Sequence, residues 1–247
     1  MDAPCARHTP PLLVLETGEP VPGLRRHGGF AHWIRVAAGL ARDAAVAVDV
    51  RETAPPRREG FAGAIVTGSA AMVSDRHDWS ERAADWLREA AQAGMPLLGI
   101  CYGHQLLAHA LGGEVGDNPA GREMGTVEVQ LHPQAADDPL FAPLPGRFAA
   151  QASHLQSVLR PPPRAVVLAR SPGDDCQAFR WGATAWGVQF HPEFSVGHMR
   201  GYVRARREAL RAEGHSPERI SRTISAAPHA RGVLRRFAAH ARRRPPR

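Results

Sequence analysis

Residues 96–105 read PLLGICYGHQ, a short apolar run that passes without a linker into a helical pattern. Gly99 and Gly103 stand two residues before and two residues after Cys101. This spacing is typical of a sharp strand-to-helix turn, because larger side chains at these two positions would collide where the backbone folds back. The turn exposes its central side chain at the carboxyl edge of a sheet, where open α/β sheets bind ligands. The segment therefore predicts Cys101 as a nucleophile. A buried cysteine in a glycine-rich turn is the alternative.

The chain before this turn alternates between strand and helix patterns. Short apolar runs predict strands at 11–16, 46–50, 63–68 and 96–100. Apolar residues recur at helical spacing in the intervening segments, most clearly over 79–93, where we expect Asp78 or Ser80 to cap the helix. Strands that alternate with helices predict an α/β fold: an open, mostly parallel sheet with helices on both faces.

The pattern changes in the second half of the chain. Short strands separated by turns are predicted at 126–131, 147–150, 165–170, 176–181 and 185–190. With little helix between them, these strands predict an antiparallel addition to the sheet. Helical patterns return at 196–213, 217–225 and 230–243. We therefore expect a main domain over 11–197 and an Arg-rich helical C-terminal extension over 198–247.

The basic charge of the chain is concentrated in this extension. All 31 basic residues are Arg, and the formal net charge is +7. Residues 1–197 hold 17 Arg against 21 acidic residues, a net charge of −4, whereas residues 198–247 hold 14 Arg against 3, a net charge of +11. A basic segment can bind nucleic acid or an acidic partner through counterion release. Solvated, Arg-coated helices would have the same composition, and we expect these rather than a nucleic-acid partner.

The composition predicts a globular protein of the cytoplasm. Hydrophobic residues make up 43% of the chain and charged residues 22%, a balance that excludes wholesale disorder. No apolar run reaches the roughly 20 residues of a membrane span, so we expect no membrane partner. The first ten residues lack the apolar stretch of a signal peptide. Three cysteines, Cys5, Cys101 and Cys176, are too few for a disulfide framework and fit a reducing cytosol.

A second motif, VQFHPE, occupies residues 188–193. His191 and Glu193 stand two residues apart at the end of a strand-like run, where such residues point to the same face. The Glu193 carboxylate can therefore hold the imidazole, and with Cys101 the pair supplies the nucleophile, base and orienter of acyl transfer. Zinc deaminases also use a His-x-Glu pair, but no downstream Pro-Cys-x-x-Cys follows here. We expect neither a metal nor a cofactor.

Acyl transfer also needs N–H donors for the oxyanion that develops on the attacked carbonyl. The segment Thr67-Gly68-Ser69 follows the strand at 63–68, beside the nucleophile turn in the expected sheet. The amides of Gly68 or Ser69, together with that of Tyr102, are the candidate donors. A common Gly-Ser turn without this role is the alternative.

Two segments, GICYGHQLLAHALGG (99–113) and GVQFHPEFS (187–195), resemble the class I (triad) glutamine amidotransferase family. The resemblance extends from about residue 64 to residue 195. It implies a flavodoxin-like open α/β fold. It also implies hydrolysis of the side-chain amide of glutamine to glutamate and ammonia, through a γ-glutamyl thioester.

The resemblance assigns roles to residues at matching positions. It implies Cys101 as the nucleophile, His191 as the base and later the acid, and Glu193 as the orienter of His191. It implies an oxyanion hole built from the backbone amides of Gly68 or Ser69 and of Tyr102. It further implies substrate contacts by residues on the helix after the nucleophile and in QASHLQSV (151–158): Gln105, Ser153 and His154.

The chain also departs from the family pattern. Residues 67–70 read Thr-Gly-Ser-Ala, where many synthetase-linked members have Gly-Gly-Pro or Gly-Pro-Gly. This segment and NPAGRE (118–123) are closer to free-standing relatives, some of which act as γ-glutamyl peptidases. No Gly-rich phosphate loop of the G-x-x-x-x-G-K-[ST] kind is present, so any ammonia acceptor would be a separate synthetase subunit.

Three hypotheses about function remain open. The first is hydrolysis of glutamine, with ammonia passed to a partner or released. The second is hydrolysis of γ-glutamyl peptides or conjugates such as glutathione. The third is a non-catalytic scaffold whose basic C-terminal region binds nucleic acid or a protein partner. A complete set of Cys101, His191 and Glu193 favours the two catalytic hypotheses.

Overall fold

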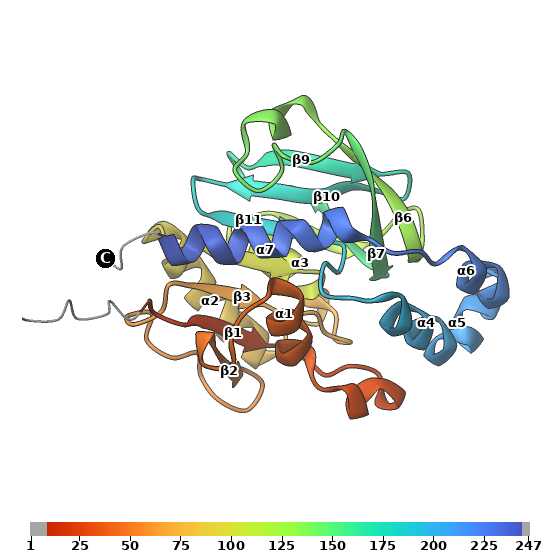
Figure 1. The fold of residues 1–247 in the computed structure, drawn as a ribbon, viewed down its shortest axis with the longest axis horizontal. Helices are drawn as coiled ribbons and strands as arrows, with labels where there is room; N and C mark the ends of the chain where they lie inside the picture. The colour runs from red at the N-terminus through yellow and green to blue at the C-terminus, as the bar shows by residue number, and fades with distance from the viewer. Residues whose placement is uncertain (1–8, 244–247) are drawn as a thin grey trace, which may run out of the picture.

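The computed structural model describes residues 9–243, so Cys5, the expected absence of a signal peptide and the last residues of the Arg-rich end lie outside the described residues. One sheet dominates the fold. Its strands are β1 (Leu12–Glu16), β2 (Ala45–Asp49), β3 (Gly63–Val66), β4 (Leu97–Ile100), β6 (Glu123–Leu131), β7 (Arg147–His154), β9 (Val166–Ser171), β10 (Asp174–Trp181) and β11 (Ala185–Val188). They lie in the order β2-β1-β3-β4-β11-β10-β9-β6-β7 (Figure 1).

The sheet has a parallel half and an antiparallel half, as the sequence predicts. Strands β2, β1, β3, β4 and β11 pair in parallel, and β10, β9, β6 and β7 continue the sheet with antiparallel pairing. The prediction for 185–190 holds on one side only. Strand β11 pairs antiparallel with β10, as predicted, but parallel with β4, with Val188 opposite Ile100. Side-chain alternation marks a strand and carries no information on its direction, so sequence alone could not place β11.

Helices cover both faces of the sheet. They are α1 (Phe30–Ala38), α2 (Asp78–Gln92), α3 (Tyr102–Ala110), α4 (Val196–Ala205), α5 (Arg207–Ala212), α6 (Pro217–Thr223) and α7 (Pro228–Arg243). Short 3-10 helices lie in the connections: η1 (Pro22–His27), η2 (Arg42–Ala44), η3 (Val73–Asp75) and η4 (Pro133–Asp137). Helices α1 and α7 pack side by side on one face, and α2 and α3 pack on the other. The fold is the open, flavodoxin-like α/β class that was expected.

The structure adds two features that the sequence did not predict. Strands β5 (Glu114–Asp117) and β8 (Gln156–Arg160) form a separate two-stranded sheet. Helix α2 begins after His77 without a side-chain cap, so the expectation of a cap at Asp78 or Ser80 was wrong. Ser80 lies inside the helix instead, and its hydroxyl is 2.7 Å from that of Tyr102.

The C-terminal region lies partly away from the sheet and partly on it. The expected boundary between residues 197 and 198 falls inside α4. Helices α5 and α6 extend outward, and α7 then returns across the sheet face (Figure 1). The buried side of α7, which includes Phe237, joins the same hydrophobic core as β1 and β4. The division into two domains stays a prediction. Within residues 9–243, every helix is too short or too polar to span a bilayer.

Candidate functional site

Cys101 sits at the turn between β4 and α3, with φ 53° and ψ −106°. A residue with a side chain rarely adopts a positive φ, and such strained residues cluster at functional sites. A Cβ atom at Gly99 would collide with the Gly103 carbonyl, and one at Gly103 would collide with the Val66 carbonyl. Glycine is therefore required on both sides of Cys101. The sharp turn predicted from the sequence is present, but Cys101 is largely buried, with 5% of its surface exposed, where the sequence predicted an exposed side chain.

His191 and Glu193 follow β11 and lie beside this turn. The backbone N–H of His191 donates to the Gln151 carbonyl at 2.8 Å, which fixes the chain as it leaves the sheet. The imidazole Nδ1 is 2.7 Å from Glu193 Oε1, and the ring stacks on Phe194 with centroids 4.0 Å apart. The His191 side chain also interacts with the Cys101 thiol. Because Nδ1 is engaged by Glu193, Nε2 is the ring nitrogen that remains for Cys101.

The surroundings of His191 favour its charged form. Burial alone would lower the pKa of this imidazole. The Glu193 carboxylate, followed by Cys101, outweighs burial and raises the pKa of His191 to about 10. At neutral pH the ring therefore holds a proton next to the Cys101 sulfur.

The loop after β3 approaches the pair of Cys101 and His191. A Cβ atom at Gly68 would lie 3.0 Å from His191 Cε1, a contact tight enough to press on the imidazole. The Gly68 carbonyl accepts hydrogen bonds from the Thr17 and Thr67 hydroxyls, each at 3.1 Å. In a trans peptide the next N–H points opposite to the carbonyl, so the Ser69 amide faces away from Thr17.

Tyr102 offers a second backbone donor at the site. Its amide is the first N–H of α3 and has no partner within the helix. The next amide, that of Gly103, donates to the Thr67 carbonyl at 3.1 Å and so ties the start of α3 to the loop after β3. This hydrogen bond holds the candidate oxyanion donors of the loop, the amides of Gly68 and Ser69, close to the Tyr102 amide.

Gln105 points from α3 into the same region and is almost fully buried. Its side-chain Nε2 donates to the Gln156 carbonyl at 2.6 Å and to Gln189 Oε1 at 2.9 Å. Gln105 is therefore held in one orientation between β8 and the segment that follows β11. In β7, the Ser153 carbonyl lies 3.8 Å from Cys101 Sγ.

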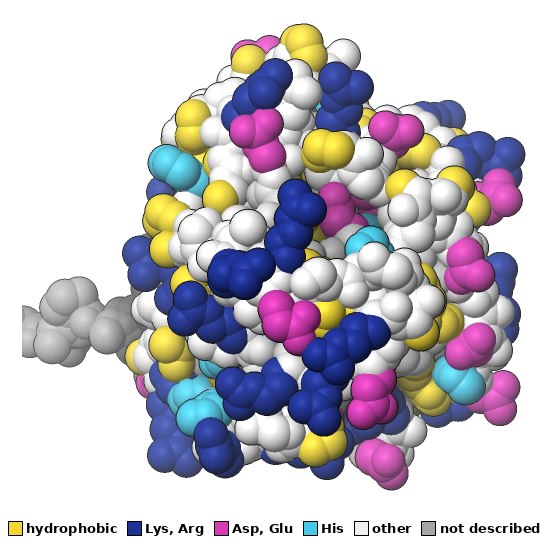
Figure 2. Space-filling view, turned by 90° about the vertical axis from the view of Figure 1, so that its right-hand side faces the viewer, with side chains coloured by type: hydrophobic (Ala, Val, Ile, Leu, Met, Phe, Trp, Pro, Cys, Tyr) yellow, Lys and Arg dark blue, Asp and Glu magenta, His cyan; other side chains and the backbone are white. Residues whose placement is uncertain are grey.

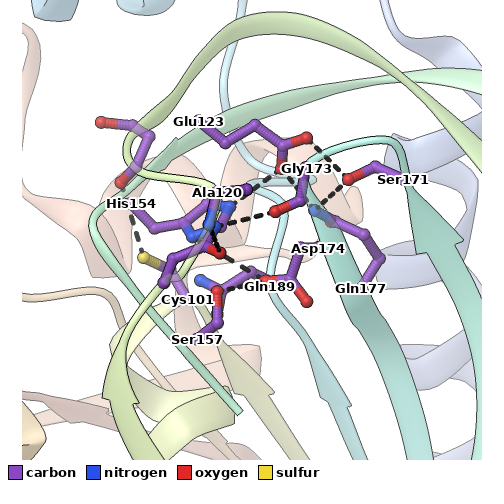
Figure 3. A network of polar contacts seen from close by, with 12 residues as sticks. Cys101, Ala120, Glu123, His154, Ser157, Ser171, Gly173, Asp174, Gln177 and Gln189 are labelled. Carbon is purple, nitrogen blue, oxygen red and sulfur yellow. Dashed lines mark hydrogen bonds and ion pairs between the residues drawn. The ribbon is translucent and has the colours of Figure 1, made fainter. Parts of the chain in front are cut away.

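His154 belongs to a buried polar network (Figure 3). Its Nε2 is 2.9 Å from Glu123 Oε2, and its Nδ1 is 3.0 Å from the Gln156 carbonyl. Glu123 also accepts hydrogen bonds from Ser171 and Gln177, both at 2.6 Å. Both ring nitrogens of His154 are thus engaged, which suits a residue that shapes the site rather than one that exchanges protons during a reaction.

A cavity with two lobes opens onto Cys101. The smaller lobe, about 80 Å³, is lined by Tyr102 and Gln105. The larger lobe, about 290 Å³, is lined by His191. The predicted residues that line one or both lobes are Ser69, Cys101, Tyr102, Gln105, Ser153, His154 and His191. Gly68 and Glu193 contact His191 from outside the lobes.

Sequence reasoning did not single out several residues that complete the site. Thr17 holds Gly68 and Glu123 holds His154 through contacts between distant segments, whereas Phe194 stacks on its near neighbour His191. Gln189 could have been noticed, because it lies inside the quoted segment GVQFHPEFS. No group of three or more His, Cys, Asp or Glu side chains within residues 9–243 is arranged to hold a metal ion.

The structure is an open α/β sheet that presents a cysteine on a strained strand-to-helix turn, beside a histidine and a carboxylate. Residues 31–206 match the family model described as glutamine amidotransferase class-I. The chain belongs to the class-I glutamine amidotransferase family.

Relatives with assigned names include two kinds of GMP synthase chain. A glutamine-hydrolyzing GMP synthase of Aeropyrum pernix is 42% identical over 149 residues, which cover 60% of this chain and 27% of the relative. The chain thus spans about a quarter of the length of that relative. A shorter chain of Halobacterium salinarum, named as one subunit of a glutamine-hydrolyzing GMP synthase, is 34% identical over 172 residues, which cover 68% of this chain and 85% of the relative.

The fold is shared with solved structures. A glutamine amidotransferase from Thermotoga maritima aligns with a TM-score of 0.73 at 21% identity, over 96% of this chain and all of the other. At this level of identity the likeness shows the fold alone.

Proposed function

We propose that this protein hydrolyses the γ-glutamyl amide of glutamine to glutamate and ammonia, with Cys101 as the nucleophile. One observation carries the proposal. His191 is held by Glu193 through Nδ1 at 2.7 Å and interacts with the thiol of Cys101 on its strained turn. Nucleophile, base and orienter in this order are what acyl transfer requires.

The reaction follows from this arrangement in two stages. The Cys101 thiolate attacks the γ-carbonyl carbon and a carbon–sulfur bond forms. The carbon–nitrogen bond then breaks, and the departing amine takes the proton from His191. Water next attacks the γ-glutamyl thioester and gives a proton to His191. The thiolate leaves, and glutamate is released.

The surrounding groups would stabilise and position the substrate. We assign the amides of Ser69 and Tyr102 as donors to the oxyanion, with Gly68 shaping the loop. Gln105, Ser153 and His154 would contact the γ-glutamyl group. These roles are supported by the position of all three side chains at the smaller lobe of the cavity.

A partner would determine the fate of the ammonia. The similarity to chains that are named as single subunits of GMP synthase supports a separate synthetase chain that accepts it. The cysteine usage of the chain supports a cytoplasmic location for this protein.

A second candidate function is hydrolysis of γ-glutamyl peptides or conjugates. The larger lobe, about 290 Å³ on the His191 side of Cys101, favours this candidate, because ammonia alone needs far less space. The chemistry at sulfur would be the same, and only the departing amine would differ. The scaffold hypothesis lacks such support, because it gives no reason for His191 to lie between Glu193 and Cys101.

Ammonia and glutamate release by the purified protein tests the proposal. L-Glutamine and glutathione serve as parallel substrates, and Cys101→Ala as the control. Cleavage that depends on Cys101 is expected for glutamine, for glutathione or for both. Equal turnover in the Cys101→Ala protein would overturn the catalytic assignment. Retention on nucleic acid, weakened by salt and lost on deletion of residues 198–247, would instead support the scaffold hypothesis.

A further inference from the structure

Two threonine hydroxyls converge on the loop that follows β3. Thr17 comes directly after β1, and Thr67 directly after the neighbouring strand β3. The Thr67 N–H donates to the Leu15 carbonyl at 3.1 Å, so the pairing of the two strands continues to this point. Two positions after Leu15, the Thr17 N–H donates to the Thr67 hydroxyl at 3.0 Å instead of to a backbone carbonyl. The strand pairing therefore ends on a side chain, which leaves the Thr67 carbonyl for other donors.

The two carbonyls of this loop are bound from within the chain. The Gly68 carbonyl lies 3.1 Å from Thr17 Oγ1 and 3.1 Å from Thr67 Oγ1. The Thr67 carbonyl lies 3.0 Å from Thr17 Oγ1 and also accepts from the Gly103 N–H at 3.1 Å. Each hydroxyl carries one proton, so the Thr67 hydroxyl can serve Gly68 while that of Thr17 reaches both carbonyls. Rotation of the Gly68 peptide plane would leave a buried oxygen without a donor, which is costly.

The held carbonyl sets the direction of the next amide. The peptide bond between Gly68 and Ser69 is trans, so the Ser69 N–H points away from the two threonines. Ser69 lines both lobes of the cavity together with Cys101. Gly18 packs directly against this residue, because a Cβ atom at Gly18 would lie 2.9 Å from the Ser69 Cα. The Ser69 amide, an assigned oxyanion donor, is thereby held in one orientation.

Position 68 gives the loop little stiffness of its own. Glycine populates positive and negative φ about equally, so its peptide planes rotate more readily than those of other residues. A side chain would restrict that freedom, but a Cβ atom at Gly68 would press on the His191 ring at 3.0 Å. The Thr17 and Thr67 hydroxyls therefore supply the restriction that a side chain at position 68 cannot.

Both hydroxyls lie inside the molecule. Thr17 and Thr67 are fully buried. Arg side chains are prominent on the side of the molecule that carries α4–α6 (Figure 2), and one of them, Arg206, lines both lobes. A partner chain that docks on this side would meet these arginines, whereas the groups that orient the Ser69 amide stay covered.

We propose that Thr17 and Thr67 are positioning residues that preset the oxyanion hole, by holding the Gly68 carbonyl so that the Ser69 N–H faces the attacked carbonyl of the substrate. A donor that is already oriented needs no reorganisation as negative charge develops, which is how such donors lower the barrier. Turnover then requires no partner chain to arrange this loop. The inference rests on the proposed function, because it assumes that attack by Cys101 produces an oxyanion.

Removal of the Thr17 hydroxyl tests the inference. Thr17→Val keeps the branched shape without the hydroxyl, Thr17→Ala is a second variant without it, and Thr17→Ser keeps the hydroxyl. Thr223→Val is the matched control, because its exposed hydroxyl also donates to a backbone carbonyl, that of Ile220 at 2.9 Å, and lines neither lobe.

Two activities are measured for each purified protein without any partner. The first is turnover, as kcat and KM for glutamine and for glutathione. The second is the rate at which iodoacetamide alkylates Cys101. Alkylation displaces iodide from a saturated carbon and forms no oxyanion, so it reports on the nucleophile and not on the oxyanion hole.

Thr17→Val and Thr17→Ala are expected to lower kcat by roughly ten- to hundredfold and to change KM by less than about threefold, because the donor acts on charge that develops only in the transition state. Alkylation of Cys101 keeps its wild-type rate in both variants. Thr17→Ser recovers most of the lost kcat, and Thr223→Val resembles the wild type.

Three results would overturn the inference. Wild-type kcat in Thr17→Val would show that the Ser69 amide is oriented without the hydroxyl, and would leave the proposed function intact. An equal loss of turnover and of alkylation in both hydroxyl-free variants would place the effect of Thr17 on the nucleophile or on the fold. Rapid alkylation of wild-type Cys101 without turnover of either substrate would remove the proposed function of the isolated chain, and the inference with it.

Discussion

At the scale of single residues, Cys101 and Glu193 have unequal roles in the proposed reaction. Cys101 forms and breaks a bond in every cycle, whereas Glu193 acts only through His191. We expect Cys101→Ala to lower kcat/KM for the γ-glutamyl substrate by roughly 10⁴–10⁶-fold. The loss in Glu193→Gln should be smaller than this loss by a factor of about ten to a hundred. Glutamate release by both variants checks this order. A larger loss in Glu193→Gln than in Cys101→Ala would contradict the assigned roles.

The charge of His191 can be tested separately from turnover. Its pKa is raised because the Glu193 carboxylate and Cys101 outweigh burial, so the ring should stay protonated through neutral pH and lose its proton near pH 10. Glu193→Gln removes the largest raising influence and should move this step to lower pH. An NMR titration of the imidazole measures both proteins. An unchanged midpoint in the variant would show that Glu193 does not control the charge.

The same shift links His191 to stability. The folded-state pKa lies above the unfolded value of about 6.5, so the protonated ring stabilises the fold. This contribution is complete below about pH 6.5 and is lost as the pH rises toward the raised pKa. Denaturant titrations at several pH values should therefore show a smaller alkaline loss of unfolding free energy in Glu193→Gln than in the wild type.

At the scale of elements, the turn between β4 and α3 depends on glycine. A Cβ atom at Gly103 would collide with the Val66 carbonyl, which is backbone and cannot swing away. We expect Gly103→Ala to lower the free energy of unfolding by about 1–3 kcal/mol, the usual cost of overpacking. Gly146→Ala is the matched control, because its Cβ would meet nothing within 4 Å. Urea titrations measure the free energy of unfolding of both variants. Equal values would contradict the tight packing of Gly103 against the Val66 carbonyl.

The elements also show which parts of the site a sequence can predict. Gly99, Cys101 and Gly103 form a local motif whose steric requirement is contained in ten residues, so the turn could be predicted. The hydrogen bond between Glu123 and His154 joins residues that are 31 positions apart, so no local sequence pattern indicates it. The direction of β11 likewise depends on its neighbours β4 and β10. Contacts between residues that are distant in the sequence therefore could not be predicted.

At the scale of the whole molecule, α7 connects the end of the described chain to the main core. Phe237 is fully buried and packs at 74° to the ring of Trp186, with centroids 6.3 Å apart. We expect Phe237→Ala to lower the free energy of unfolding by about 3–5 kcal/mol, as for other buried aromatic residues. Arg242→Ala, an exposed position on the same helix, should change it little. Equal changes in the free energy of unfolding in the two variants would mean that α7 does not contribute to the main core.

Covalent labelling tests whether Cys101 is the nucleophile. A glutamine analogue in which a chloromethyl ketone replaces the γ-amide would lose chloride to the Cys101 thiolate and leave a stable thioether. Peptide mapping by mass spectrometry locates the label, and glutamine turnover is measured in the same samples. We expect label on Cys101, which lines both lobes of the cavity, and none on Cys176, which lines neither. Glutamine should slow labelling, and turnover should fall in proportion to the label. Undiminished turnover with Cys101 fully labelled would contradict its role as the nucleophile.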